Sequence, residues 1–338
     1  MPRGLTRITA ALLCAVAGFC AGCGAGSGAD RDSLVVYSAG PRPLAEAVIA
    51  AFTAETGIEV ELFAATTGQI MAKLEAERHR PRADVVVFAS GVAAEALKAE
   101  GRLLPYVPDW LDETRREWHD REHYYFATSA AVVGIALRGA VYAPDIEWAD
   151  VLGGDFAGRL TMPSPSRSGS AGDFVLAYTV REGEAAWPRF RGARRAGLEF
   201  SAANSQAITS LLIGAYDGIV GAVDYLIYRQ IAAGADVRMH FPPSGGALVT
   251  RPVAILADTP VPEKARRFVD FYFTRESQER VAAAHLLPAR AGVELSEARG
   301  ADGMPPVFEV PADNALRHHA AVLRRFQLEI ERAAVVRD

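Results

Sequence analysis

The protein has 338 residues, of which 50% are hydrophobic and 23% charged, and its formal net charge is -5. A chain of this length and composition can bury the cores of two globular domains. The sequence has no basic stripe and no arginine-aromatic tract, so nucleic acid is excluded as the expected partner.

The first 23 residues have the pattern of a secretory signal peptide. A basic start, "MPRGLTRIT", precedes the apolar run "AALLCAVAGF", which is too short to span a membrane comfortably. The run leads into "CAGC", and Ala21-Gly22-Cys23 resembles a bacterial lipobox, although Cys20 stands where that pattern usually has leucine. We therefore expect Cys23 to be lipidated and to become the new N-terminus. The alternative is cleavage of a simple secretory signal nearby.

All three cysteines, Cys14, Cys20 and Cys23, lie in this leader. The mature chain is therefore expected to form no internal disulfide and to use no thiolate as a metal ligand or nucleophile. Residues 24–33, "GAGSGADRDS", have the composition of a flexible tether. We expect a periplasmic or extracellular protein that is held at the membrane through Cys23.

Strands and helices alternate in the next part of the chain. The predicted elements are a strand at 33–40, a helix at 42–57, a strand at 58–65, a helix at 66–79 and a strand at 83–90. The last strand, "ADVVVFAS", is almost continuously apolar, as expected for a parallel sheet covered on both faces. This order implies right-handed crossovers and an α/β layer.

Beyond residue 100 strands and helices no longer alternate regularly, and the chain is predicted to build a second lobe. Residues 103–118 indicate a loop with a short helix, and the apolar extended segment 124–138 is able to cross between lobes. The strand 251–257 then returns to the first lobe, which gives two crossings. The predicted first lobe comprises residues 34–127 and 249–338, and the second comprises residues 128–248.

Residues 164–174 read "SPSRSGSAGDF" and lead into the apolar, helical run "FVLAYTV". The first N–H groups of a helix have no partner within it, and the helix dipole makes that end positive. Glycine allows a ligand to approach the backbone closely, and the serines add donors, so this helix start can hold an anion. The alternative is a polar loop with a serine cap.

Several ordered segments resemble one protein family over roughly residues 33–293. "VVYSAG", "FTAETGIEVEL", "TTGQIMAKLEAE" and "PRADVVVFAS" are similar to the first lobe of bacterial type 2 extracellular solute-binding proteins of ABC importers. "WADVLGGDFAGRLTMPSPSRSGSAGDF" resembles the segment that opens the second lobe of that family, and "RPVAILADTPVPEKARRFVDF" resembles its return to the first. The branch with the closest resemblance contains ferric-, thiamine- and aminoethylphosphonate-binding proteins.

The resemblance implies a two-lobe type 2 periplasmic-binding-protein fold, in which each lobe is a mixed sheet flanked by helices. It also implies the substrate-binding component of an ABC transporter, which closes about a hinge on a small solute and hands it to a permease in the cytoplasmic membrane. Because of the serine loop, we expect an anionic solute such as a phosphonate or a phosphate ester. We expect a monomer that uses no cofactor.

Ligands of this family sit between the lobes, where loops at strand ends face one another. In the ferric-binding branch, the segment that matches Ser168–Ser170 holds a phosphate-like anion, and Asn204 matches a further anion contact. Thr66–Gly68 open another helix and would supply a second anion clamp, while Arg42 and Arg167 could donate paired hydrogen bonds to a phosphonate. The candidate ligand-binding residues are Ser38, Gly40, Arg42, Thr66, Thr67, Gly68, Ser90, Arg167, Ser168, Gly169, Ser170, Asn204, Asp224 and Tyr225.

Ferric iron is the alternative solute. The ferric branch uses a histidine after its first strand, a glutamate after its third and two adjacent tyrosines in its second lobe. Here the first place holds no histidine, Ser90 occupies the second, and the tyrosine pair aligns with Asp224-Tyr225. An iron site would use Asp224, Tyr225 and Tyr228, which supply only part of the anionic oxygens that a hard ferric ion prefers. Asp224 could equally accept a hydrogen bond from an amine of the solute.

A secreted hydrolase is a distant alternative. "SGSAG" differs from the Gly-x-Ser-x-Gly elbow of serine hydrolases because Ser168 stands where the first glycine belongs, so we expect no enzyme. His119 and His123 are four residues apart but flanked by charge, which favours a solvated face over a metal site. For Arg251, a contact to the ligand and an ion pair on the surface both stay open.

Overall fold

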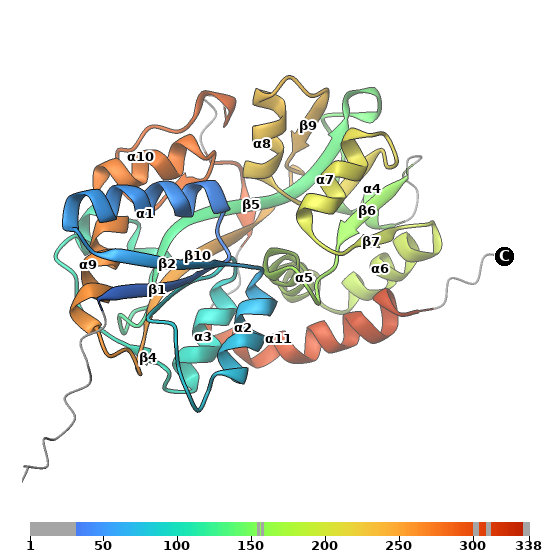
Figure 1. Ribbon diagram of the computed structural model, residues 1–338. Helices are drawn as coiled ribbons and strands as arrows, with labels where there is room; N and C mark the ends of the chain where they lie inside the picture. Colours follow the sequence, from blue (N-terminus) through green and yellow to red (C-terminus); the bar gives the residue numbers. More distant parts are fainter. Residues whose placement is uncertain (1–31, 154–155, 157–158, 300–303, 309–311, 334–338) are drawn as a thin grey trace, which may run out of the picture. The chain divides into compact units, whose positions relative to one another are not determined.

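A computed structural model describes residues 32–338 apart from 154–155, 157–158, 300–303, 309–311 and 334–338 (Figure 1). The predicted signal peptide, Cys23 and most of the predicted tether lie outside the described residues. Within the described ranges, the structure contains no helix long and apolar enough to cross a lipid bilayer.

Strands and helices follow one another in the predicted order. Up to residue 104 the elements are β1 (Ser33–Ser38), α1 (Arg42–Thr56), β2 (Glu59–Ala64), α2 (Thr67–Ala76), β3 (Val85–Val87), α3 (Gly91–Ala99) and β4 (Leu103–Leu104). The middle of the chain forms β5 (Phe126–Arg138), α4 (Trp148–Leu152), β6 (Leu160–Pro163), α5 (Gly169–Glu182), α6 (Ala186–Arg195), β7 (Glu199–Ser201), α7 (Asn204–Leu212), β8 (Gly218–Val223), α8 (Asp224–Ala232) and β9 (Val237–His240). The remaining elements are β10 (Gly246–Leu256), α9 (Pro262–Tyr272), α10 (Arg275–Ala283), β11 (Leu287–Pro288), β12 (Val307–Phe308) and α11 (Ala312–Phe326).

The main strands form one mixed sheet in the order β2-β1-β3-β10-β5-β8-β6-β7. At one end β1 pairs in parallel with β2 and β3, and at the other β6 pairs in parallel with β7 and β8. β5 and β10 lie between these groups, antiparallel to each other and to their outer neighbours. The sheet therefore contains two parallel groups, one for each predicted lobe, joined by two long strands.

These two long strands are the crossings that the sequence predicts. β10 pairs with β3 of the first group through Val253–Ile255, and β5 pairs with β8 of the second through Val133–Leu137. The register of β10 against β5 shifts between Arg251 and Pro252, and proline has no N–H to donate to a sheet. Because both predicted lobe boundaries fall inside these shared strands, the lobe limits stay a prediction.

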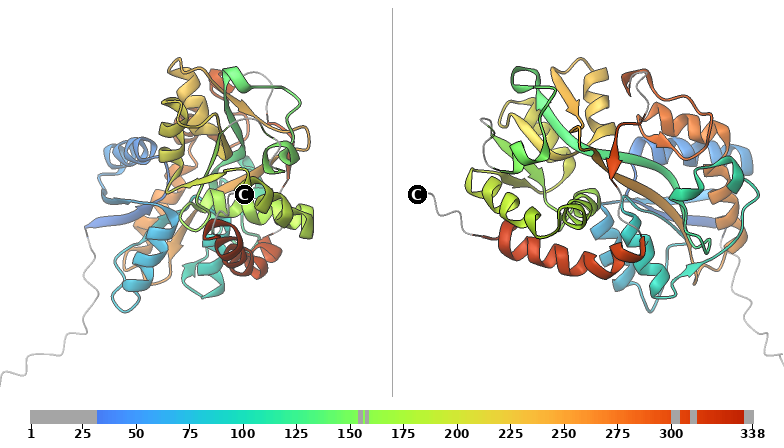
Figure 2. Two further views of the ribbon diagram at one scale, coloured as in Figure 1. Left: turned by 90° about the vertical axis from the view of Figure 1, so that its right-hand side faces the viewer. Right: turned by 180° about the vertical axis from the view of Figure 1, so that it is seen from behind.

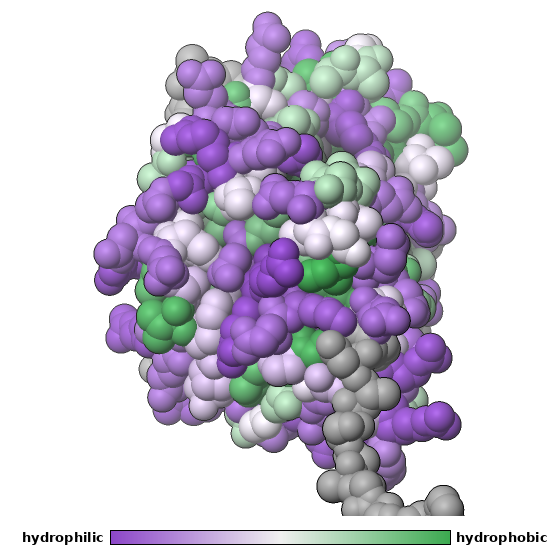
Figure 3. All heavy atoms as spheres, turned by 60° about the vertical axis from the view of Figure 1, so that its left-hand side comes forward, coloured by the Kyte–Doolittle hydropathy of each residue, from purple (hydrophilic) through white to green (hydrophobic). Residues whose placement is uncertain are grey.

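Helices cover both faces of the first parallel group. The side chains of β1 alternate, so that Val36 packs in the cluster that holds Phe52 of α1, and Tyr37 packs in the cluster that holds Ile70 of α2. Phe268 of α9 lies edge-on against Phe52, with ring centroids 5.2 Å apart. The helices thus turn their apolar sides inward. On the face shown in Figure 3, hydrophilic residues predominate and hydrophobic ones form small separate groups.

The C-terminal helix α11 packs on helices from both parallel groups (Figure 2). Val322 lies in one apolar cluster with Val92 of α3 and Leu176 of α5. Phe326, at the end of the helix, lies edge-on against Phe190 of α6, with ring centroids 5.0 Å apart. The predicted domain limits assign this helix to the first lobe, but its packing joins α3 to α5 and α6.

The segment before β5 corrects one prediction. Residues 103–118 contain two short 3₁₀ turns, and the chain then folds back so that His119 is buried. Its Nδ1 accepts a hydrogen bond from the backbone N–H of Ala127 at 3.0 Å, and burial lowers the pKa of His119 to about 4. The predicted solvated histidine face is therefore wrong, because it assumed a helix with one side exposed to water.

Candidate functional site

The predicted ligand-binding residues lie where parallel strands end. In an α/β sheet, ligands bind beyond the carboxyl ends of the strands, where loops and helix starts face the same space. The candidates lie at six strand ends: Ser38 is the last residue of β1, Gly40 and Arg42 follow it, and the others are Thr66–Gly68 after β2, Ser90 after β3, Arg167–Ser170 after β6, Asn204 after β7, and Asp224 and Tyr225 after β8.

Three helix starts, two from the first parallel group and one from the second, meet at Gly169. Gly169 is the first residue of α5, and a Cβ atom placed on it would lie 3.0 Å from Thr67 Oγ1 and 3.1 Å from Ser90 Cβ. Thr67 begins α2, and Ser90 caps α3 by accepting a hydrogen bond from the backbone N–H of Ala93 at 3.4 Å. Because each helix start carries positive charge density, their meeting point favours an anion.

The serine loop and Asn204 form one polar cluster, which we call the serine-asparagine cluster (Ser168, Ser170 and Asn204). The amide nitrogen of Asn204 lies 3.2 Å from the hydroxyl oxygens of both serines, which are 3.1 Å from each other. The Asn204 Oδ1 atom is buried and has no hydrogen-bond partner among the described residues. Asn204 is thus brought to two serines that lie 36 and 34 residues earlier in the chain, and its Oδ1 atom stays free as an acceptor.

Other predicted residues of these helix starts are used within the protein. Thr66 and Gln69 form a capping box, in which the Thr66 hydroxyl accepts from the Gln69 N–H at 3.3 Å. The Ser38 hydroxyl accepts from the Gly40 N–H at 3.1 Å. A Cβ atom on Gly68 would lie 3.8 Å from the backbone oxygen of Arg167. The start of α2 therefore lies beside the loop at Arg167, whereas the Ser38 contact stays within its own loop, and the roles of all these residues toward a ligand stay predictions.

The two guanidinium groups that the sequence suggested for the pocket lie on the surface. The side chain of Arg42 is 70% exposed and forms an ion pair with Glu46, four residues further along α1, at 2.7 Å. Arg167 is also exposed. Neither residue joins the serine-asparagine cluster in this structure.

A different arginine is buried where the lobes join. Arg251 of β10 is only 3% exposed, so the predicted alternative of a surface ion pair is wrong. Its Nη2 donates to the backbone oxygen of Ala39, just after β1, at 2.9 Å. The guanidinium also lies over the ring of Tyr225, at 5.4 Å from the ring centroid, which is a favourable cation-π position.

An acidic residue that the sequence did not single out connects the two parallel groups. Asp173, the fifth residue of α5, accepts a hydrogen bond from the Ser90 hydroxyl at 2.7 Å and another from the backbone N–H of Gly91. Burial raises the pKa of Asp173 to about 7, although both hydrogen bonds act in the opposite direction. The carboxyl group therefore fastens the start of α3 to α5 close to Gly169.

Asp224, a candidate for binding a ligand amine or a metal, is already fully engaged. It is fully buried and accepts hydrogen bonds from the backbone N–H groups of Val132 at 2.9 Å and Tyr225 at 2.6 Å. Its other partner is Arg299, whose guanidinium forms a buried ion pair with the carboxylate. Burial raises the pKa of Asp224, and the charge of Arg299 acts against that rise.

The same arginine also engages the third residue of the alternative iron set. The guanidinium of Arg299 lies 5.0 Å from the ring centroid of Tyr228. Among the residues that the structure describes, no group of three or more His, Cys, Asp or Glu side chains is placed to hold a metal ion. Arg299 lies beyond residue 293, where the family resemblance ends, so no motif in the sequence pointed to it.

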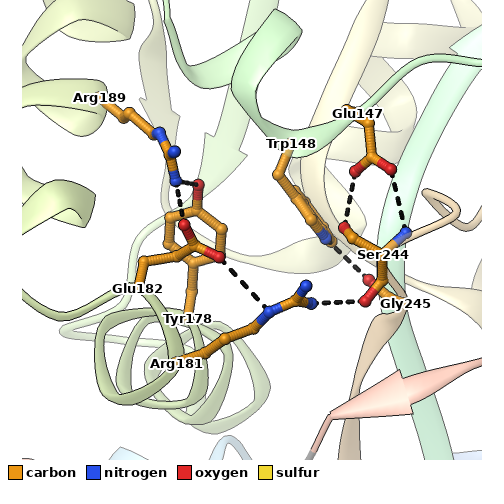
Figure 4. Close-up of polar contacts among 8 residues, drawn as sticks. All are labelled: Glu147, Trp148, Tyr178, Arg181, Glu182, Arg189, Ser244 and Gly245. Atoms are coloured by element: carbon orange, nitrogen blue, oxygen red, sulfur yellow. Dashed lines mark hydrogen bonds and ion pairs between the residues drawn. The ribbon is translucent and has the colours of Figure 1, made fainter.

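The far end of α5 is fixed by a polar network (Figure 4). Arg181 donates to the backbone oxygen of Ser244, and the indole N–H of Trp148 donates to the backbone oxygen of Gly245 at 2.8 Å. Glu147 accepts from the backbone N–H of Ser244 at 3.0 Å and from its hydroxyl at 2.6 Å. Arg181 thus ties the end of α5 to the loop at Ser244, which the contacts of Glu147 and Trp148 also hold.

Comparison with known proteins gives a family match over most of the chain. A family model described as bacterial extracellular solute-binding protein matches residues 34–286. A probable ABC transporter periplasmic-binding protein of Sinorhizobium fredii is 26% identical over 264 residues, which cover 75% of this chain and 72% of the relative.

Two solved structures have the same fold. The ferric binding protein of Campylobacter jejuni is 18% identical, with a TM-score of 0.79 over 88% of this chain and 99% of that protein. The periplasmic binding protein AfuA of Actinobacillus pleuropneumoniae, solved with fructose-6-phosphate bound, is also 18% identical, with a TM-score of 0.78 over 89% of this chain and 99% of that protein. The predicted two-lobe α/β fold is therefore confirmed.

Proposed function

The chain belongs to the bacterial extracellular solute-binding proteins of ABC transporters, and from this premise we propose that its solute is a small anion, a phosphonate or a phosphate ester. One observation carries the proposal: the serine-asparagine cluster lies at the start of α5, where two further helix starts meet it. Neutral donors at positive helix ends bind anions without needing a full charge. The structural neighbour AfuA, which was solved with a phosphate ester, supports the same class.

The proposed mechanism is closure of the two lobes about β5 and β10. The contact of Gly169 with Thr67 and Ser90 joins helix starts of opposite lobes, so a solute that touches both sides favours the closed form. A permease in the cytoplasmic membrane would then recognise the closed form. The protein would act as a monomer. The solute is released unchanged, because the protein has no catalytic step to perform.

A thermal-shift screen tests the proposed solute class. The screen compares fructose 6-phosphate with fructose, and 2-aminoethylphosphonate with ethanolamine, beside inorganic phosphate, thiamine phosphate, molybdate and ferric citrate. We expect the melting temperature to rise with a phosphonate or a phosphate ester and not with its uncharged or cationic counterpart. A rise with the uncharged compounds alone would contradict an anionic solute.

Iron uptake is the alternative within the same screen. The predicted iron set is Asp224, Tyr225 and Tyr228. Arg299 contacts Asp224 and Tyr228, which leaves Tyr225 as the member of the set that could bind a metal. We expect no visible tyrosinate-to-iron absorption band when ferric salt is added. An intense band that disappears in Tyr225→Phe would restore iron as the cargo.

We further propose that Cys23, which lies outside the described residues, anchors the protein to the membrane. One acyl chain gives only marginal membrane binding, whereas two chains hold a protein stably. Cys23→Ser should therefore move the protein from the membrane fraction to the soluble fraction, as measured by immunoblotting of fractionated cells. Wild-type protein found wholly in the soluble fraction would show that Cys23 is merely removed with the leader.

A further inference from the structure

We infer that Arg251 is the residue that neutralises the charge of the solute, so that the solute binds the protein directly as an anion and not through a metal ion. This inference rests on the proposed function, because it assigns a role within the same site. It differs from the sequence-based prediction, which gave the guanidinium role to Arg42 and Arg167.

The position of Arg251 is the first argument. The residue lies on β10, one of the two strands that both lobes share, and pairs there with Ser129 of β5. Its guanidinium contacts Ala39, in the loop after β1, and Tyr225, at the start of α8. Arg251 therefore lies between a loop of the first lobe and a helix start of the second, at the carboxyl ends of both parallel groups.

The second argument is that the positive charge of Arg251 has no acidic partner in the part of the chain that the structure describes. No acidic side chain among the described residues forms an ion pair with Arg251. A guanidinium has five N–H donors, of which one hydrogen bond, to Ala39, is formed within the described protein. Charged side chains are rarely buried unless they are paired. The buried Arg299 shows the usual solution, because it is paired with Asp224.

The chemistry of the rest of the site gives the third argument. The serine hydroxyls of the serine-asparagine cluster and the backbone N–H groups of the helix starts provide neutral donors, which orient a group of acceptor oxygens but leave its formal charge without a partner. The guanidinium fork supplies that partner for a tetrahedral oxyanion. A bare ferric ion would instead be repelled by the positive charge beside Tyr225.

The alternative is that Arg251 only braces the loop at Ala39, and Arg251→Met separates the two roles. Methionine keeps most of the apolar volume and removes the charge. A brace stabilises the protein without solute, whereas an unpaired buried charge destabilises it. We therefore expect Arg251→Met to raise the melting temperature of the solute-free protein by about 2–4 °C and to weaken binding at least about thirtyfold.

The experiment measures melting temperatures without solute and calorimetric affinities for fructose 6-phosphate, 2-aminoethylphosphonate and inorganic phosphate. Arg251→Lys, which keeps the charge but loses the fork, should bind with intermediate affinity. Arg78→Met is the matched control, because Arg78 is 46% exposed and pairs with Glu75 and Glu100 on the surface. It should leave both quantities unchanged.

Two results would overturn the inference. One is a lower melting temperature of solute-free Arg251→Met, which is the behaviour of a brace. The other is an unchanged affinity of that variant for an anion that the wild type binds. If the wild type binds none of the three anions, the proposed solute class fails, and the melting temperature of the solute-free variant still decides whether Arg251 is an unpaired charge or a brace.

Discussion

Gly169→Val is expected to weaken binding of the solute about 5- to 150-fold while the protein stays folded. A Cβ atom at this position would lie 3.0 Å from Thr67 Oγ1 and 3.1 Å from Ser90 Cβ, and valine adds two further methyl groups. The new side chain would hold apart the starts of α2, α3 and α5. Overpacking of this kind costs about 1–3 kcal/mol. Because the added side chain is crowded only when the two lobes are together, it destabilises the closed form and not the open form.

The measurement is calorimetry with whichever anion the thermal-shift screen identifies. Ser170→Ala is a companion variant that removes one hydroxyl from the serine-asparagine cluster without adding bulk, and it should weaken binding about tenfold because a hydrogen bond to a charged group is lost. Ala99→Val, at an exposed position at the end of α3, controls for the valine substitution itself. An unchanged affinity of Gly169→Val would show that the lobes do not need this contact to close.

Arg299→Met is expected to lower the free energy of unfolding by about 3–5 kcal/mol. The Asp224 carboxylate is fully buried, and Arg299 is the cation that faces it. Removal of the guanidinium leaves an uncompensated charge, since the two backbone N–H groups that remain carry no formal charge. The loss should be partly recovered in the double variant Asp224→Asn/Arg299→Met, because asparagine needs no counter-ion.

The pH dependence of this loss follows from the protonation of Asp224. Burial already raises the pKa of Asp224 above its usual 3.8, with Arg299 acting against the rise. In Arg299→Met the folded-state pKa rises further, so the folded protein holds a proton that the unfolded chain releases. The free energy of unfolding of this variant therefore falls as the pH rises above the pKa that Asp224 has in the unfolded chain. The deficit relative to wild type should therefore be larger at pH 7.5 than at pH 5.

Urea unfolding at the two pH values measures both effects. Arg42→Met is the matched control, because it breaks an exposed ion pair with Glu46 that is worth at most about 1 kcal/mol. A loss for Arg299→Met no larger than that of the control, or one that does not depend on pH, would show that Asp224 does not need this partner.

The strand and helix order, and the position of the candidate residues at the strand ends, could be predicted because both follow from local patterns. β1, α1 and β2 begin and end within about two residues of their predicted limits, since alternating and helical spacings are properties of short segments. Ser168, Ser170 and Asn204 lie together as the family resemblance implied.

The parts that could not be predicted depend on contacts between distant segments. Asp173 meets Ser90 across 83 positions, and Arg299 meets Asp224 across 75, so no spacing in the sequence signals either pair. Arg42 is an instructive contrast, because its partner Glu46 lies four residues away on the same helix. That spacing was visible in the sequence and favours a surface ion pair.

The register shift between Arg251 and Pro252 has a mechanical consequence. In the proposed closure, Arg251 and the irregularity in β10 lie at the same point of a strand that both lobes share, so a solute bound at Arg251 would act close to the closure axis. Displacement grows with distance from an axis, so in this closure residues near Arg251 should move least, and α9 and α6, which lie toward opposite sides of the molecule in Figure 1, should move most. A pair of fluorophores that converts closure into an optical signal therefore belongs on those two helices, far from the site that it monitors.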